Sequence, residues 1–123
     1  MDTAARLFRI LVVDDEPLIR WSIAETLAAA GHQVAEAEDA ASALRAIDVD
    51  PDLDLVFLDF RLPDSNDLGL LAKIRERAPR ATVVMMTAFG MPEVAAGALK
   101  LGAARVMNKP FDMRDIQELV RTI

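Results

Sequence analysis

Residues 53–59 read LDLVFLD, and this stretch decides the fold. Residues 53–58 are apolar at every position except Asp54, which is typical of a β-strand that is buried on both faces in the middle of a parallel sheet. We therefore expect a central strand over Leu53–Leu58, with Asp59 directly after it. Ligands bind to open parallel sheets at the carboxyl ends of the strands. The sequence thus predicts that Asp59 lies at the ligand-binding edge of a sheet.

Short apolar runs alternate with segments of helical period on both sides of this strand. The alternation is typical of βαβ units, so we predict an α/β fold with a single doubly wound, five-stranded parallel sheet. The length suits one domain over residues 1–123. The predicted strands are Arg9–Val13, Gln33–Ala37, Leu53–Leu58, Thr82–Met86 and Arg105–Met107. The predicted helices are Pro17–Ala30, Ala40–Ile47 with Asp39 as N-cap, Asp67–Arg77, one from Pro92 up to Gly102, and a last one after the N-cap Asp112.

The composition limits the class of protein. With 20 acidic and 14 basic residues the net charge is −6, which would repel phosphates, so we expect no direct nucleic-acid binding. The absence of cysteine excludes disulfides and thiolate metal sites. No apolar run approaches the roughly 20 residues that span a bilayer. We expect a soluble, cytoplasmic protein that does not contact a membrane.

Polar residues also follow other strands of the predicted sheet. Asp14 and Asp15 come after the first strand, Thr87 after the fourth and Lys109 after the fifth. Three carboxylates brought together collect a cation, and oxygen ligands without His or Cys favour Mg²⁺. A lysine ammonium and a threonine hydroxyl suit the oxygens of a phosphoryl group in transfer. We predict a phosphoryl-transfer pocket in which Asp59 is the nucleophile.

Four motifs of the chain resemble the receiver domain of two-component response regulators. They are LVVDDE at 11–16, LDFRLP at 58–63, MTAF at 86–89 and NKPF at 108–111, in the family's order and along nearly the whole chain. MTAF and the IRW of residues 19–21 are most similar to the NtrC type, whose receivers often precede a sigma-54-activating ATPase and a DNA-binding domain. The resemblance implies the strand order 2-1-3-4-5.

The resemblance also implies a signalling switch that catalyses only its own phosphorylation and dephosphorylation. Asp59 would accept a phosphoryl group from a phosphohistidine of a sensor histidine kinase. Thr87, the main-chain amide of Ala88 and Lys109 would contact the phosphoryl oxygens. A cis Lys109-Pro110 peptide bond is expected from the same resemblance, and X-Pro bonds are where cis is least costly.

The metal ligands are implied in the same way. Asp15, Asp59 and the main-chain carbonyl of Arg61 would hold Mg²⁺ directly, and Asp14 would act mostly through water.

The family resemblance extends to partners. Phosphorylation would reorganise the face made by helix four, strand five and helix five, through which a homodimer can form. The last helix reaches Ile123 without a stop signal, so we expect an N-terminal fragment of a longer regulator, with an output domain beyond it. On the kinase side, we hypothesise contacts through Trp21 and Phe111. His32 is interpreted as a turn residue without a phosphate or metal role.

Two positions depart from the family pattern. Val106 stands where many receivers have an aromatic residue that swings inward, so output by loop shifts is expected instead. Asp67 stands where a glycine is common, and Asp adopts a positive φ only at some cost.

Alternative functions remain open at this point. A phosphate-independent receiver fold would explain Val106. A Mg²⁺-dependent aspartyl-phosphate phosphatase of the haloacid dehalogenase type also uses Asp, Thr and Lys, but that family wants Asp-x-Asp where this chain has Asp59-Phe60-Arg61. A flavodoxin-like cofactor binder would need a phosphate cradle after the first strand, which the sequence lacks.

Overall fold

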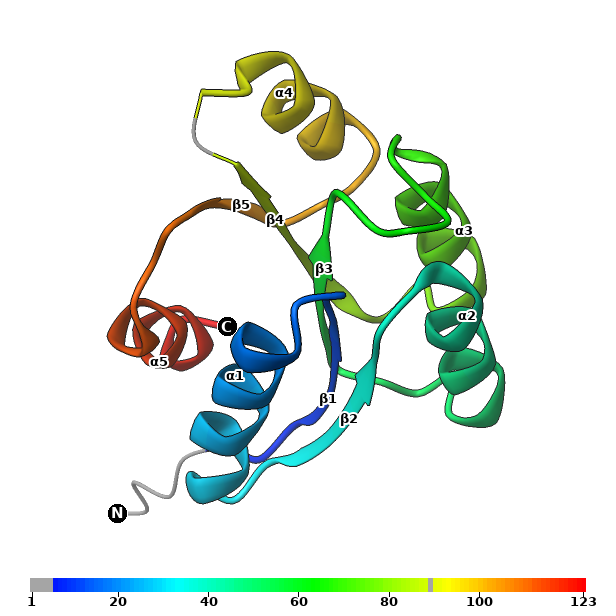
Figure 1. Cartoon of the computed structure of the whole chain (residues 1–123). Helices are drawn as coiled ribbons and strands as arrows, with labels where there is room; N and C mark the ends of the chain where they lie inside the picture. The colour runs from blue at the N-terminus through cyan, green and yellow to red at the C-terminus, as the bar shows by residue number, and fades with distance from the viewer. Residues whose placement is uncertain (1–5, 89) are drawn as a thin grey trace.

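The computed structural model describes residues 6–88 and 90–123, which form a parallel β-sheet between two layers of helices (Figure 1). The sheet has five strands, as the sequence predicts, and their order β2-β1-β3-β4-β5 is the one that the family resemblance implies. The strands are β1 (Arg9–Val13), β2 (Gln33–Ala37), β3 (Leu55–Asp59), β4 (Thr82–Ala88) and β5 (Arg105–Lys109). The helices are α1 (Pro17–Ala29), α2 (Ala40–Val49), α3 (Gly69–Arg77), α4 (Pro92–Lys100) and α5 (Met113–Arg121).

The core lies on both faces of the sheet because alternate residues of each strand point to opposite sides. On one face, β3 residues Leu55 and Phe57 pack with side chains of α1 and α5. On the other face, Val56 and Leu58 pack with side chains of α2, α3 and α4. All five residues of β3 are buried, and β3 pairs with β1 and β4. The predicted central position of this strand is confirmed.

Three strands extend further than the sequence predicts, and this moves the polar residues into the sheet. β3 ends at Asp59, β4 at Ala88 and β5 at Lys109. Backbone pairing continues to these residues: the Phe60 amide donates to the Met86 carbonyl at 2.8 Å, and Ala88 pairs with Lys109. The apolar run alone was a poor guide to the strand ends, because ladder hydrogen bonds involve the main chain and not the side chain.

Two element starts also differ from the prediction. β3 begins at Leu55 instead of Leu53, and the carboxylate of Asp54, directly before it, accepts a hydrogen bond from the Arg9 amide at 2.8 Å. α3 begins at Gly69 instead of Asp67. The Asp67 carboxylate accepts a hydrogen bond from the Gly69 amide at 2.8 Å, so it shapes the turn before the helix.

Helix caps follow the sequence closely. Asp39 and Asp112 are the N-caps of α2 and α5, as predicted, and each forms a capping box with the residue three positions later. Gly31 has φ +101° after the end of α1, a conformation that glycine adopts cheaply. None of the described non-glycine residues has a positive φ, so Asp67 does not adopt the glycine-like conformation considered for it.

The Lys109-Pro110 bond is cis, as the resemblance implies. Phe89 belongs to the MTAF motif and lies outside the described residues. None of the helices in the described part of the chain combines the length and apolarity that crossing a membrane requires.

Candidate functional site

The structure brings the predicted polar side chains together at the carboxyl edge of the sheet. Asp59 is the last residue of β3, Thr87 lies near the end of β4 and Lys109 ends β5. Asp14 follows β1, and its amide continues the pairing with β2 by donating to the Ala37 carbonyl at 3.1 Å. An open pocket of about 350 Å³ lies over this edge.

Lys109 is the centre of the hydrogen-bond network. Its Nζ lies 2.8 Å from Oδ2 of Asp14, 3.0 Å from Oε1 of Glu16 and 3.2 Å from Oδ2 of Asp59. Burial alone would lower the pKa of the ammonium group, but the hydrogen bonds to Asp14 and Glu16 and the nearby negative charges outweigh burial and raise this pKa. Lys109 is therefore a permanent cation surrounded by carboxylates.

The two buried carboxylates differ in how their oxygens are used. Asp14 is 0% exposed and uses both oxygens, because Oδ1 accepts from the Glu16 amide at 2.9 Å and Oδ2 accepts from Lys109. Asp59 is 6% exposed, and its Oδ1 has only a long contact of 3.5 Å with the Arg61 amide. The Oδ1 atom of Asp59 is thus the least engaged oxygen of the buried pair.

The environment also disfavours a charge on Asp59. Burial, followed by the negative charge of Asp14, raises the pKa of Asp59 to about 6, although Lys109 and the Arg61 amide act in the opposite direction. A cation placed beside Asp59 would relieve this cost.

An acidic cluster is available to hold such a cation. One carboxylate oxygen from each of Asp14, Asp15 and Asp59 lies within 4.8 Å of the other two. Asp15 is exposed, and its carboxylate accepts no hydrogen bond from any residue that the structure describes. Hard oxygen donors of this kind suit Mg²⁺. The donor set therefore fits a divalent cation at this edge.

Thr87 makes a contact that sequence reasoning missed. Its side chain is almost fully buried, and its hydroxyl donates to Sδ of Met91 at 3.6 Å. Met91 is the N-cap residue of α4, so the hydroxyl joins the pocket directly to the start of that helix. Nothing in the sequence pattern indicates this pairing, since a methionine four residues after a threonine is unremarkable.

Glu16 was also not predicted as a site residue. It is more than half exposed and pairs with Lys109 across the pocket mouth. Its position directly after the two aspartates was a usable signal, because the chain must turn there and keep the next side chain near the same edge.

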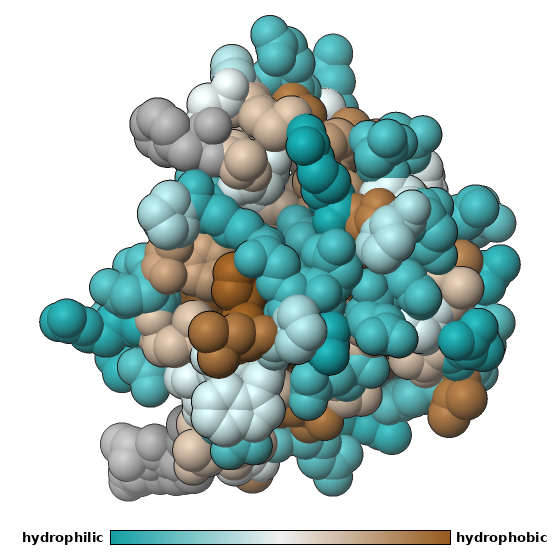
Figure 2. Space-filling view, viewed as in Figure 1, coloured by the Kyte–Doolittle hydropathy of each residue, from teal (hydrophilic) through white to brown (hydrophobic). Residues whose placement is uncertain are grey.

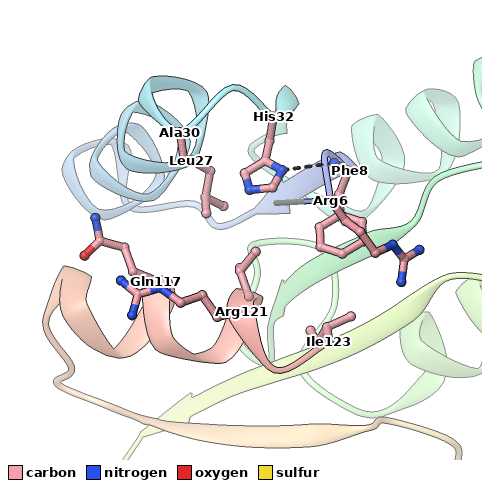
Figure 3. Close-up of a pocket in the computed structure, with 9 residues that line it drawn as sticks. Arg6, Phe8, Leu27, Ala30, His32, Gln117, Arg121 and Ile123 are labelled. Carbon is pink, nitrogen blue, oxygen red and sulfur yellow. Dashed lines mark hydrogen bonds between the residues drawn. The ribbon is translucent and has the colours of Figure 1, made fainter. Parts of the chain in front are cut away.

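A separate cavity of about 290 Å³ lies at the opposite edge of the sheet, between α1 and α5 (Figure 3). Its lining includes no carboxylate from the described part of the chain. His32 stacks on Phe8, and its Nδ1 accepts a hydrogen bond from the Phe8 amide at 2.9 Å. Burial lowers the pKa of His32, which favours the neutral ring. His32 thus fixes the entry to β1 and is more than a turn residue.

The family comparison settles what kind of domain presents this edge. Residues 10–121 match the family described as the response regulator receiver domain. The chain belongs to this receiver domain family. Receiver domains are the modules through which response regulators take up a phosphorylation signal, so the chain is a signalling module of two-component systems.

Relatives of the receiver agree with the resemblance to the NtrC type. The chain is 38% identical to the response regulator PilR of Pseudomonas aeruginosa over 93% of its own length and 25% of PilR. It is 35% identical to the transcriptional regulator NtrC of Escherichia coli over 90% of its length and 24% of NtrC. The chain therefore spans about a quarter of the length of these regulators.

A solved structure supports the same relationship. The crystal structure of the NtrX receiver domain from Brucella abortus aligns with a TM-score of 0.81 and 39% identity, covering 92% of this chain and 98% of that domain. The fold of this receiver is thus similar to that of the NtrX receiver domain.

Proposed function

We propose that this receiver is a cytoplasmic, phosphorylation-activated switch in which Asp59 accepts a phosphoryl group from a phosphohistidine of a sensor histidine kinase. The observation that carries the proposal is the state of Asp59: it is buried at the carboxyl end of β3, bonded to Lys109, and keeps Oδ1 weakly engaged. The proposal rests on the receiver family and on this geometry together.

Asp15, Asp59 and the main-chain carbonyl of Arg61 are the proposed direct ligands of Mg²⁺. Asp14 already uses both carboxylate oxygens, which suits its proposed action through water. When bound, Mg²⁺ would neutralise negative charge on the phosphoryl oxygens.

The protein groups then divide the transfer among themselves. A carboxylate oxygen of Asp59 forms a bond to phosphorus while the phosphorus–nitrogen bond of the phosphohistidine breaks and the imidazole leaves with the electron pair. Lys109 stabilises negative charge on the phosphoryl oxygens, and the Thr87 hydroxyl and the Ala88 amide donate to them. The product is an acyl phosphate on Asp59, which this same pocket would later hydrolyse.

The proposed output surface is the face made by α4, β5 and α5. Val106 is half-buried and packs against the core. A branched aliphatic side chain cannot make the inward rotation of the aromatic residue that many receivers have at this position. We therefore expect phosphorylation to change the output surface through the β4–α4 segment, where Thr87 contacts Met91. A homodimer through this face is part of the proposal, and sedimentation with and without beryllofluoride tests it. An unchanged mass would count against phosphorylation-driven pairing.

The proposed kinase contact lies at the start of α1. Leu18 and Trp21 are among the largest exposed apolar side chains, and Figure 2 shows hydrophobic atoms in this region bordered by hydrophilic ones. Phe111, after β5, is half-buried and packs against the core under α1 and α5. Side chains placed in this way can contact a helical partner beside the phosphorylation pocket.

The function of the whole regulator is proposed from its relatives. PilR and NtrC are about four times longer than this chain, and NtrC is a DNA-binding transcriptional regulator. We propose that this receiver likewise controls a C-terminal output domain, of the sigma-54-activating type. The chain's own charge of −6 makes it unsuited to bind DNA directly.

The test of the proposed function is phosphorylation by a small donor. Protein is incubated with Mg²⁺ and acetyl phosphate, and both the intact mass and the released phosphate are followed. Wild type should gain a phosphoryl group or turn over the donor, whereas Asp59→Asn should do neither. Asp67→Asn is the matched control, since it changes a carboxylate in the loop between β3 and α3, outside the pocket. Equal behaviour of wild type and Asp59→Asn would defeat the proposal.

A second candidate function is a receiver that acts without phosphate. Val106 favours it, because the aromatic side chain that many receivers use is missing. This function predicts that partner binding and mass in solution are the same for wild type and Asp59→Asn, with or without beryllofluoride.

A further inference from the structure

The two consecutive aspartates of the acidic cluster set a geometric requirement. In an extended strand, neighbouring side chains point to opposite faces. Asp14 and Asp15 nevertheless bring carboxylate oxygens within 4.8 Å of each other and of Asp59. The chain must therefore turn directly after β1. The carbonyl of Asp14 belongs to the planar peptide unit that joins Asp14 to Asp15. A group that holds this carbonyl therefore also restrains the orientation of the whole peptide unit.

Arg20 holds that carbonyl. Its Nη1 donates to the main-chain oxygen of Asp14 at 2.8 Å, and its Nε donates to Oε1 of Glu36 at 3.0 Å. Arg20 lies in the first turn of α1 and Glu36 lies on β2. The planar guanidinium thus ties the peptide between the two aspartates to both a helix and a strand.

The anchor is well ordered by its surroundings. The Arg20 side chain is 17% exposed, so water competes little for its hydrogen bonds. The Asp14 amide is held from β2 as well, since it donates to the Ala37 carbonyl. Both polar groups of the Asp14 main chain therefore have fixed partners, and one of the two is a side chain that mutation can remove.

Within the described part of the chain, Arg20 makes no hydrogen bond or ion pair with the carboxylates of Asp14, Asp15 or Asp59. Any effect on the pocket must therefore pass through the main chain of Asp14 or through charge at a distance. Glu36 pairs with the guanidinium, and its negative charge reduces the long-range effect of the Arg20 charge on the pocket.

We propose that Arg20 is a positioning residue of the metal site, which orients the Asp14-Asp15 peptide so that both carboxylates face the cation. The inference rests on the proposed function, because it assumes that the acidic cluster holds Mg²⁺. It assigns Arg20 a role in cation affinity and not in contact with the phosphoryl group.

The sign of a mutational effect separates positioning from simple electrostatics. Removing a positive charge near a cation site strengthens cation binding if only charge matters. Removing a positioning group weakens it, and partners that orient metal ligands typically contribute 10- to 100-fold in affinity. The two explanations for Arg20→Met therefore predict opposite directions.

The experiment is calorimetric titration of Mg²⁺ into the folded protein, after thermal unfolding in EDTA has shown that each variant is folded. Arg20→Met should bind Mg²⁺ about tenfold more weakly than wild type. Arg20→Lys keeps the charge but cannot hold both partners with one planar group, so it should bind about threefold more weakly. Arg20→Lys also keeps the test decisive if Arg20→Met does not fold.

The matched control is Arg77→Met. Arg77 ends α3 and pairs with the exposed Asp48 at 3.4 Å, so its loss gives the same change in net charge away from the pocket. It should leave the Mg²⁺ affinity within about twofold of wild type. Equal or tighter binding by both Arg20 variants, with wild type binding Mg²⁺, would overturn the inference alone. Failure of wild type to bind Mg²⁺ would overturn the proposed metal site first.

Discussion

The ammonium nitrogen of Lys109 lies 3.2 Å from Oδ2 of Asp59, and the same nitrogen is shared with Asp14 and Glu16. Three carboxylates, of Asp14, Glu16 and Asp59, therefore share one ammonium group. A fourth carboxylate, of Asp15, has an oxygen within 4.8 Å of oxygens of Asp14 and Asp59. The pocket carries an excess of negative charge before any ligand arrives. This excess decides how the receiver should respond to mutation, pH and metal.

Lys109→Met should destabilise the receiver. Asp14 and Asp59 are buried, and without the ammonium group their charges are left uncompensated. We expect a loss of about 2 kcal/mol in the free energy of unfolding at pH 7, partly restored by Mg²⁺. Urea denaturation with and without Mg²⁺ measures this. Unchanged stability would mean that the Lys109 ammonium group is not needed to compensate these two carboxylates.

Asp59→Asn should stabilise the metal-free receiver at pH 7. The folded-state pKa of Asp59 is about 6, above its ordinary value of 3.8, so its favourable contribution is present at low pH and is lost as pH rises through about 6. After allowance for solvent screening, we expect Asp59→Asn to gain about 1–2 kcal/mol over wild type at pH 7. The gain should shrink as pH falls towards 4. Urea denaturation in EDTA across this range tests the sign.

Mg²⁺ binding should weaken below pH 6. A protonated carboxyl group is a poor metal ligand, and the raised pKa of Asp59 places its protonation at about 6. Each unit of pH below this value should reduce the affinity up to about tenfold. Calorimetric titration between pH 5 and 8 measures the change. An affinity that stays constant down to pH 5 would exclude Asp59 as a ligand.

Met91→Leu should release the Thr87 hydroxyl. The sulfur of Met91 is its acceptor in this structure, and leucine keeps the volume but removes the acceptor. The variant should bind beryllofluoride about twofold more tightly than wild type, because the hydrogen bond to sulfur that it loses is weak. Met85→Leu is the control, because Met85 is a buried methionine on β4, the strand of Thr87, and makes no hydrogen bond with the Thr87 hydroxyl. Equal affinities of the two variants would show that this contact does not restrain Thr87.

Trp21→Ala should separate kinase transfer from chemistry. Trp21 is 55% exposed on α1, and none of the proposed pocket residues lies on this helix. Phosphorylation by acetyl phosphate should therefore be unchanged. Transfer from a phosphorylated histidine kinase that works on wild type should fall by tenfold or more, as loss of an aromatic contact residue does. Leu99→Ala, an exposed apolar change on α4, is the control. Unchanged transfer would refute the proposed contact.

The sequence predicted most of the fold and the location of the candidate site. Five strands and five helices have the predicted types, and the N-caps Asp39 and Asp112 are those predicted, because periodicity and capping depend on nearby residues. The strand ends were less well predicted. Thr87 and Lys109 lie within strands, since a polar side chain at the sheet edge leaves main-chain pairing intact.

Contacts between elements were not predictable from local patterns. Asp64 shows this at α2, where it accepts hydrogen bonds from the amides of Ala40 and Ala41 at 2.8 and 3.1 Å. The sequence indicated Asp39 as the cap but gave no reason to bring a second carboxylate from the loop after β3. Arg20 and Met91 were missed for the same reason.

By itself the sequence determined the order of elements, the central place of the LDLVFLD strand and the edge at which the polar residues gather. These follow from hydrophobic period and from the rule that parallel strands share a carboxyl edge. The tertiary structure alone decided which atoms pair there: Lys109 with Asp14, 95 residues apart, and Arg20 with the Asp14 carbonyl. Such pairings depend on how strands and helices pack, because packing fixes the distance and direction between groups that belong to different elements.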